Sequence, residues 1–517
     1  MNPANEILLS RRRWIGGALA AVSLGAPFVH LHAQSWRDRN PFGLGVASGC
    51  PTPDGVVLWT RLAPDPLQGG GMPSDAVEVG WELAYDEGFR RIAACGTAIA
   101  TEELAHSVHV ELRGLEPGRS YWYRFTAGDA QSPVGRTRTA PAEADRAAPL
   151  RLAFASCQQY EQGYYTAFRD MAAQAPDLIV HLGDYIYESS WGKRRVRRHT
   201  GGVPTQLPEF RDRYALYKSD ADLQAAHAAC PWLVIWDDHE VANDYTNDVS
   251  PQNADSAQFL ATRAAAYQAW YEHMPVPARM RPQGASATIY GRHRFGQMVD
   301  VFLLDGRQYR SHHACLKGRS ASPLVDCPER LAPDRSYLGM PQEAWLANEL
   351  AVPSTQWSVI AQPTLMAEAD RQVGPEHGYW MDGWDGYAAT RARLLDAVAT
   401  HRPRNALVIS GDVHAFWAAD LRREADAAAM ATEFVGGAIT SQGPSTASVT
   451  HLLGKNPHLR YGRSDRRGYA LMTLDAKGCI VEYRGVDDEK IPDSPVRQIA
   501  RFAVENGRAG VQIESAG

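Results

Sequence analysis

Two patterns of apolar residues divide the chain near residue 140. Before that point, short runs alternate apolar and polar residues with a period of two, and Gly, Pro and Asp separate them. The runs cover residues 55–62, 77–85, 106–115 and 120–128. This alternation is typical of antiparallel strands with one buried face. It predicts a small β-sandwich over residues 39–140.

Continuous apolar runs replace the alternating ones after residue 148. They cover residues 150–157, 177–184, 232–240, 297–305, 357–363 and 405–414. Segments with helical spacing lie between them, at 163–175, 257–274 and 387–401. Apolar strands interleaved with helices predict an α/β domain over residues 148–517, with sheets covered on both faces. The stretch "APAEADRAAP" is the expected linker between the two domains.

The first 33 residues are typical of an export signal and not of the folded protein. An arginine-rich start precedes a modest apolar run, and the small Ala33 follows at a plausible cleavage point. Ser10, Arg11 and Arg12 resemble the start of a twin-arginine signal, which exports folded proteins. An ordinary secretory signal with three arginines is the alternative. Either signal predicts a periplasmic or secreted protein without a stable membrane anchor.

The charge and the cysteine count narrow the function further. A formal charge of -6 and a pI near 6.3 give no reason to expect nucleic acid binding. Seven cysteines are an odd number for an oxidising compartment, so at least one stays unpaired. Cys315 and Cys327 flank a polar loop and are the favoured bridge, while Cys50 with Cys95 is conceivable.

Residues of types that commonly bind metals lie at the ends of four of the apolar runs. Cys157 ends the first, Asp184 and Tyr187 follow the second, "WDDHE" ends the third, and "GDVH" ends the last. Each cluster alone is commonly a structural turn. Together they would bury several unpaired charges, which is costly. Because ligands bind outside the carboxyl ends of strands in α/β sheets, we expect the clusters to share one cleft.

The donor types indicate two different ions. The thiolate, carboxylate, phenolate and imidazole of Cys157, Asp184, Tyr187 and His414 favour a trivalent or borderline transition metal such as ferric iron. Oxygen donors on Asp238, Asn243 and Asp412 suit a harder ion such as calcium.

The segments "FASCQ", "HLGDYIYE", "WDDHEVANDY" and "ISGDVH", in this order, resemble the PhoD-like alkaline phosphatase family. That family belongs with the calcineurin-like metallophosphatases, and the similarity spans nearly the whole mature chain. The resemblance implies a fold of two sheets flanked by helices behind a small sandwich. "LEPGRSYWYRF" in turn resembles the corner of fibronectin-type or immunoglobulin-like sandwiches.

The resemblance also implies site roles. Iron would be held by Cys157, Asp184, Tyr187 and His414, and calcium by Asp184, Asp412 and either Asp238 or Asn243. "MDGWDGYAATR" resembles a further family segment that contributes a metal-binding Asp, for which Asp385 is preferred over Asp382. His239 takes the catalytic or phosphate-binding position.

The implied activity is hydrolysis of small-molecule phosphate esters, monoesters and also diesters, by in-line attack of metal-activated water or hydroxide. A phosphodiesterase or phospholipase D of the same family is one rival. A calcium-stabilised exported binding protein without catalysis is another. The twin-arginine machinery is the expected export partner.

Two further segments have open roles. The basic segment Lys193–His199 is either a solvated loop or an electrostatic funnel for anionic substrates. Residues 484–510 are expected to end in a helix that covers the cleft.

Overall fold

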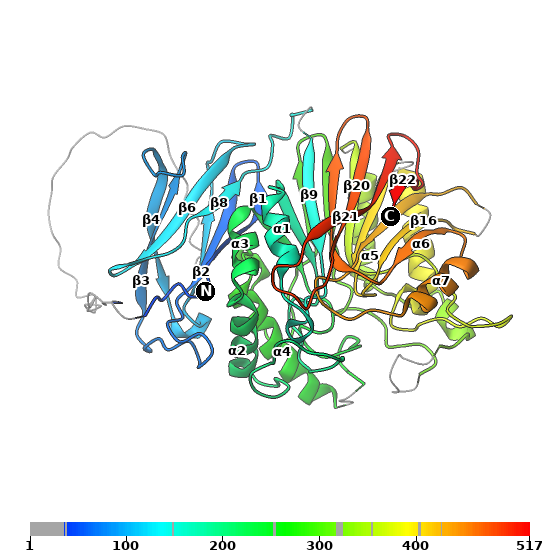
Figure 1. Cartoon of the computed structure of the whole chain (residues 1–517), viewed down its shortest axis with the longest axis horizontal. Coiled ribbons are helices and arrows are strands. Elements are labelled where there is room, and N and C mark those ends of the chain that lie inside the picture. The colour runs from blue at the N-terminus through cyan, green and yellow to red at the C-terminus, as the bar shows by residue number, and fades with distance from the viewer. Residues whose placement is uncertain are drawn as a thin grey trace.

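The computed structural model describes residues 36, 39–146, 149–251, 255–316, 324–352, 355–401, 405–424 and 427–517. The predicted export signal over residues 1–33 lies outside them. A β-rich part at one end adjoins a larger α/β part (Figure 1). Within the described ranges, no helix has the length and hydropathy needed to cross a membrane.

The N-terminal residues form the predicted sandwich. One sheet contains β3 (Val77–Ala84), β4 (Ile92–Ala100), β6 (Ser120–Ala127), β7 (Ala130–Gln131) and β8 (Gly135–Arg138). It packs on β1 (Val46–Thr52), β2 (Gly55–Arg61) and β5 (Ser107–Leu112) through a core that includes Leu58, Trp81 and Tyr123. The Tyr121 hydroxyl accepts a hydrogen bond of 2.9 Å from the Glu116 backbone N–H, which closes the corner.

The second sheet of the sandwich continues into the α/β part. Strand β1 pairs in parallel with β11 (Trp232–Ile235), with Gly49 opposite Trp232. A Cβ at Gly49 would lie 2.3 Å from the Pro275 carbonyl oxygen, so the close approach requires glycine here. The indole of buried Trp59 donates a 3.0 Å hydrogen bond to the Glu272 carbonyl. One sheet therefore joins the two predicted domains, although the two were expected from separate sequence patterns.

Two sheets form the centre of the α/β part. The ten-stranded sheet has the order β22-β21-β20-β19-β9-β10-β11-β1-β2-β5. Its further strands are β9 (Leu150–Ala155), β10 (Leu178–Leu182), β19 (Arg467–Leu474), β20 (Gly478–Val486), β21 (Val496–Glu505) and β22 (Gln512–Ala516). The second sheet contains β12 (Gly291–Phe295), β13 (Val299–Leu303), β14 (Trp357–Thr364), β15 (Ala406–Gly411), β17 (Ala431–Gly436), β16 (Phe416–Leu421) and β18 (Leu459–Arg463), in that order.

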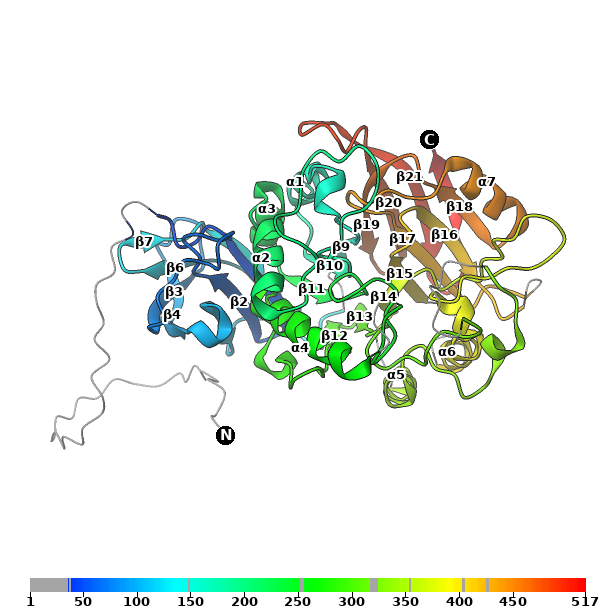
Figure 2. The same cartoon turned by 90° about the horizontal axis from the view of Figure 1, so that it is seen from below.

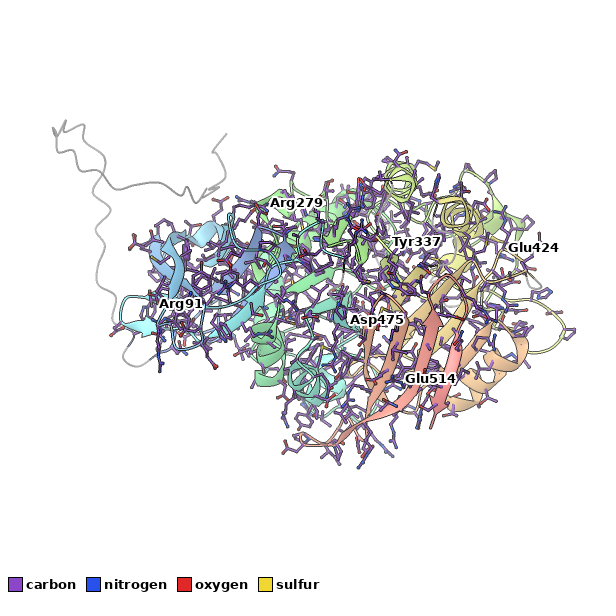
Figure 3. All side chains as sticks on the ribbon, turned by 90° about the horizontal axis from the view of Figure 1, so that it is seen from above. Arg91, Arg279, Tyr337, Glu424, Asp475 and Glu514 are labelled. Atoms are coloured by element: carbon purple, nitrogen blue, oxygen red, sulfur yellow. A yellow bond between two sulfur atoms is a disulfide. The ribbon has the colours of Figure 1, made fainter. Side chains whose placement is uncertain are left out.

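The two sheets share one core. Phe154 on β9, Leu407 on β15 and Phe434 on β17 belong to the same buried cluster. Side chains fill the interior of the molecule (Figure 3). Strands β9, β10 and β11 run parallel in one sheet, and β13, β14, β15 and β17 run parallel in the other. The predicted double-sheet α/β fold is confirmed.

Helices cover the outer faces of both sheets (Figure 2). On the side of the ten-stranded sheet lie α1 (Thr166–Ala173), α2 (Leu207–Lys218), α3 (Ala221–Ala229) and α4 (Ser256–His273). On the side of the seven-stranded sheet lie α5 (Met340–Ala351), α6 (Ala388–His401) and α7 (Thr446–Lys455). Helices α1, α4 and α6 match the three predicted helical segments.

The expected C-terminal helix over the cleft is wrong. Residues 496–505 form β21, which pairs with β20 and β22 at the edge of the ten-stranded sheet. Phe502 and Val504 alternate with more exposed neighbours and are buried, and Phe502 packs on Tyr483 of β20. This period of two favours a strand, and an apolar neighbouring strand is present to receive its buried face.

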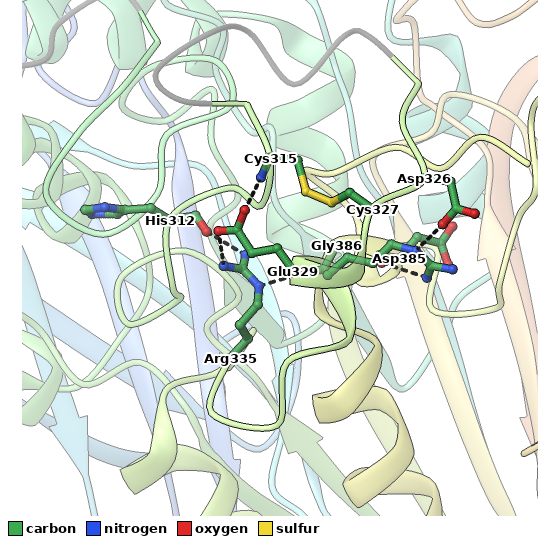
Figure 4. Close-up of a disulfide and its surroundings, with 9 residues drawn as sticks. His312, Cys315, Asp326, Cys327, Glu329, Arg335, Asp385 and Gly386 are labelled. Atoms are coloured by element: carbon green, nitrogen blue, oxygen red, sulfur yellow. Dashed lines mark hydrogen bonds and ion pairs between the residues drawn. A yellow bond between two sulfur atoms is a disulfide. The ribbon is translucent and has the colours of Figure 1, made fainter.

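The favoured disulfide, Cys315–Cys327, is formed (Figure 4). The Glu329 carboxylate accepts a 2.7 Å hydrogen bond from the Cys315 N–H and pairs with Arg335. Cys50 and Cys95 are both free, so the conceivable second bridge is absent.

Part of the basic segment has structural partners. Arg195 pairs with Glu161, and Arg197 pairs with Asp220 and lies over the Tyr160 ring. These two cations therefore have partners within the fold.

The shared sheet predicts that the two parts unfold together. Trp59→Ala removes a buried ring and its hydrogen bond at the junction, so it should lower the free energy of unfolding by about 3–5 kcal/mol. Scanning calorimetry should show one transition that moves to lower temperature as a whole. Two separate transitions, with only one of them shifted, would contradict a shared cooperative unit.

Candidate active site

The predicted clusters meet where parallel strands of both sheets end. Cys157 follows β9 and Asp184 follows β10 in one sheet, while Asp412 and His414 follow β15 in the other. The strand ends approach closely, because a Cβ at Gly411 would lie 2.2 Å from the Ser156 hydroxyl oxygen. The two sheets thus bring residues more than two hundred positions apart into one site.

Four of these residues have a strained backbone. Cys157, Asp184, Asp412 and His414 have φ values of 60°, 55°, 60° and 50°, in the left-handed region. Each such residue costs of order 1 to 3 kcal/mol, and such strain concentrates at functional sites. All four strained residues therefore lie at strand ends that contribute to the shared site.

The Tyr187 hydroxyl is the centre of the first group. It donates a 2.8 Å hydrogen bond to Asp184 Oδ2, accepts one of 2.8 Å from the Ser441 hydroxyl, and lies 3.1 Å from His414 Nε2. Ligand atoms of Cys157, Asp184 and His414 all lie within 4.8 Å of one another. The four residues predicted to hold iron are therefore brought together.

The imidazole of His414 is prepared to act as a nitrogen ligand. Its Nδ1–H donates a 2.9 Å hydrogen bond to the Gln442 carbonyl, which leaves the lone pair on Nε2, the atom next to Tyr187. Trp191 stacks on the ring at 5.6 Å between centroids. Burial, with help from Arg467, lowers the pKa of His414 to about 3, so the ring stays neutral.

A second group of candidate ligands, five carboxylates and His239, adjoins the Cys157–Asp184–His414 group. Its ligand atoms form three sets, each within 4.8 Å: Asp184, Asp237 and Asp412; Asp184, Asp238 and His239; and Asp238, Asp244 and Asp382. Asp184 belongs to the Cys157 set and to two of these, so it lies between the two groups. A carboxylate in this position can bridge two cations.

Several oxygens of these carboxylates lack hydrogen-bond partners. Among the described residues, the buried and unpartnered atoms include Asp184 Oδ1, Asp237 Oδ2, Asp382 Oδ2 and Asp412 Oδ2. Buried polar atoms are normally paired. Unpartnered carboxylate oxygens pointing into a shared site, with a thiol and an imidazole, fit a site for metal cations.

Arg307 supplies part of the compensating positive charge. Its buried guanidinium lies 2.5 Å from Asp237, 2.8 Å from Asp382 and 3.5 Å from Asp238. Arg310 and His313 also pair with Asp382. These cations do not reach Asp184 or Asp412, so the centre of the site keeps an excess of carboxylates.

The pKa values reflect this excess. Burial raises the pKa of Asp184 well above its usual value. Burial and the charge of Asp238 raise the pKa of Asp412 to about 7, and burial raises that of Asp237 to about 8. Asp238 differs, because the charges of Arg307 and His239 outweigh its burial and lower its pKa. In the protein without bound cations, these carboxyl groups therefore stay protonated at a higher pH, which reduces the excess of negative charge.

His239 faces this centre from the end of β11. Its Nδ1–H donates a 2.7 Å hydrogen bond to Glu188, and its ring lies 4.1 Å from that of Tyr187. Burial opposes the charged form of His239, but Glu188, Asp238 and Asp184 together raise its pKa well above the usual value. The Glu188 carboxylate thus orients the ring and favours its protonated form.

The site opens into a cavity of about 760 Å³. Asp238, His239, Asp412 and His414 lie in its wall with Arg371. Trp191, Val203, Phe259, Leu324 and Trp380 add apolar surface to the same wall. A volume of this size accommodates a small organic ligand.

Asp385 and Asn243, two predicted metal ligands, differ in where the structure places them. Asp385 is corrected: its carboxylate pairs with Arg391 at 2.6 Å and accepts the Ala369 N–H, so Asp382 is the acid that joins the carboxylate group. Asn243 lies in the cavity wall, and its backbone N–H donates to Glu188. Asp238 belongs to two of the ligand sets.

Several participants were missed from the sequence. Asp237 and Asp244 are next to predicted residues, and their acidic type was the available signal. Glu240 accepts the N–H groups of Asp184, Tyr185 and Asp237, which fixes two strand ends. Arg307 and Ser441 reach the site from distant segments, and nothing in the local pattern marks them.

Known proteins resemble the chain over nearly its full length. Residues 152–483 match the family model "PhoD-like phosphatase", and residues 29–141 match "PhoD-like phosphatase, N-terminal domain". Alkaline phosphatase D of Bacillus subtilis (strain 168) is 42% identical over 523 residues, which cover 97% of this chain and 88% of the relative. A solved structure entitled "Structure of PhoD" is 42% identical, covers 93% of each chain and has a TM-score of 0.89.

The raised carboxyl pKa values predict how pH acts on the metal-free protein. In the folded chain the pKa of Asp412 is about 7 and that of Asp237 about 8, whereas an Asp of the unfolded chain has a pKa of about 4. The folded form therefore holds protons that the unfolded form releases, and the free energy of unfolding should fall as pH rises from about 4 to about 8.

Thermal melts of chelator-treated and metal-loaded protein across this pH range measure the effect. Bound cations replace the protons, so the loaded protein should lack this loss of stability. An equal slope in both samples would contradict a cation site at these carboxylates.

Proposed function

We propose that this chain, which belongs to the PhoD-like phosphatase family, hydrolyses phosphate esters in the cavity beside the two ligand groups. The observation that carries the proposal is the cluster of unpartnered buried carboxylate oxygens next to a ligand-sized cavity, whose wall includes Asp412 of the cluster. Such oxygens need cations, and cations beside a cavity can bind a phosphate ester. The family membership supports this activity.

The donor types support two different ions. Cys157, Asp184, Tyr187 and His414 would hold ferric iron, which suits a mixed set of thiolate, phenolate, imidazole and carboxylate donors. Asp184, Asp238 and Asp412, with Asn243 or the Asp244–Asp382 pair, would hold calcium through oxygen donors. When bound, the ions would stabilise charge on phosphoryl oxygens and lower the pKa of water.

His239 is the proposed catalytic acid. Glu188 holds Nδ1, so Nε2 is the nitrogen free to serve the substrate, and the surrounding carboxylates favour the protonated ring. The imidazolium would donate its Nε2 proton to the oxygen of the departing alcohol. The apolar residues of the remaining wall would contact the organic part of the substrate.

Monoesters and diesters both fit this proposal. The cavity volume of about 760 Å³ exceeds what a phosphate group alone requires. The apolar wall formed by Trp191, Phe259 and Trp380 can receive a second ester substituent. Phosphodiesterase activity, including action on lipid head groups, is therefore the second candidate.

The proposed location is the periplasm or the cell exterior. Residues 10–33 have the arginine-rich start and the apolar run of a twin-arginine signal. The Cys315–Cys327 disulfide agrees with an oxidising compartment. Export in the folded state would allow the metals to be inserted before translocation.

Turnover of a chromogenic phosphate monoester and of the matching diester tests the function. The metal-loaded protein should hydrolyse the monoester, a chelator should abolish the activity, and adding back iron and calcium should restore it. The ratio of the turnover rates of the monoester and the diester shows which of the two substrates the protein prefers. A metal-loaded protein that cleaves neither substrate would contradict the proposal and favour a non-catalytic binding protein.

His239→Ala tests the catalytic acid. Loss of general acid catalysis should lower turnover by about 10²- to 10⁴-fold while the metal content stays intact. The loss should be larger for an alkyl phosphate than for an aryl phosphate, because the poorer leaving group needs the proton more. Equal losses on both substrates, or near-normal turnover, would exclude the role.

A further inference from the structure

Arg371 is a half-buried cation of the cavity wall, and the catalytic roles proposed above do not use it. It lines the cavity together with Asp412 and Trp380. Its Nε is buried and has no hydrogen-bond partner, and no ion pair joins its guanidinium to an Asp or Glu of the described ranges. Arg391, by contrast, pairs with both Asp385 and Glu368.

The segment that carries Arg371 is firmly held. The Arg371 N–H donates a 2.8 Å hydrogen bond to the Gly378 carbonyl. Asp370 Oδ1 accepts the N–H groups of Gln372 and Gly378, and Asn456 accepts the Asp370 N–H. The backbone on both sides of Arg371 is therefore fixed before any ligand binds.

The Arg371 guanidinium lies over the Trp380 ring, with Cζ 5.4 Å from the ring centroid. This cation–π contact offsets part of the cost of burial but satisfies none of the N–H donors. Tyr379, beside Trp380, forms a backbone bridge with Val325, two residues before the disulfide-bonded Cys327. The wall of the cavity at Arg371 is thus supported by the bridged loop.

An unpaired guanidinium in a cavity wall is suited to one kind of ligand. A buried Nε–H without a partner is costly, and an anion with several oxygens can accept this hydrogen bond and balance the charge. The planar fork of arginine matches phosphate oxygens in a bidentate manner. Asp412, one of the candidate cation ligands, lines the same cavity, so an oxyanion bound there would have both Arg371 and the candidate cation site in the cavity wall.

We propose that Arg371 binds a non-bridging oxygen of the substrate's phosphate group and so positions the ester against the metal site. This inference rests on the proposed function, because it takes the same cavity as the place of reaction. Arg371 then acts in binding, and it sets a requirement for an anionic phosphate group.

The test uses the metal-loaded, full-length chain and inorganic phosphate as the probe. Arg371→Ala should weaken competitive inhibition by phosphate by about 10- to 100-fold and raise KM for the ester to a similar extent. Metal content should not change. Arg497→Ala, which removes an exposed arginine on β21, is the matched control and should leave both constants unchanged.

Arg371→Lys covers the case in which the alanine variant folds poorly. It keeps the charge but loses the fork, so phosphate affinity should fall by at least about threefold with normal thermal stability. Phosphate inhibition and KM within twofold of the wild type, in either well-folded variant with its metals, would overturn the assignment.

The two proposals fail differently. If the metal-loaded wild type hydrolyses no ester but binds phosphate more tightly than the Arg371 variants do, the proposed function is wrong and the phosphate site at Arg371 is supported. Normal ester hydrolysis with phosphate affinity unchanged in the variants would overturn Arg371 alone.

Discussion

The structure depends on the cost of burying carboxylates from two sheets at one point. Asp184 and Asp412 come from different sheets, and each keeps a buried oxygen without a partner. Arg307 neutralises Asp237 and Asp382 on one side, but no arginine or lysine among the described residues pairs with the two central acids. Protons balance this charge in the protein alone, and bound cations would replace them, so the strand ends and the cavity fit a metal site.

The fold makes this convergence possible. Parallel strands present their carboxyl ends at one edge of each sheet, and the packing of the sheets brings the two edges together. Gly411 permits the approach to Ser156. Hydrogen bonds from the N–H groups of Asp184, Tyr185 and Asp237 to Glu240 then hold two neighbouring strand ends in register.

Much of this arrangement could be predicted from the sequence. The switch from alternating to continuous apolar runs located the sandwich and the α/β part, and the polar residues after the strands located the first ligand group. Asp385 and Asp382 could not be told apart, because they lie three residues apart and differ only in whether Arg391 or Arg307 is their partner.

Contacts between distant segments were beyond local patterns. Arg307, Ser441 and Arg371 reach the cavity because of tertiary packing, and a single basic or hydroxyl residue carries no periodic signal. The helix predicted near the C-terminus is the strand Val496–Glu505, because its pairing with β20 depends on a neighbouring strand and not on its own composition. The same holds for β1, whose place beside β11 joins the sandwich to the α/β part.

Anomalous X-ray diffraction from crystals of the purified protein, recorded above and below the iron absorption edge, tests the central claim most directly. The account predicts an iron peak among Cys157, Asp184, Tyr187 and His414, with a second, lighter ion on the far side of Asp184. Protein with full phosphatase activity and no ion bound to Asp184 would contradict it.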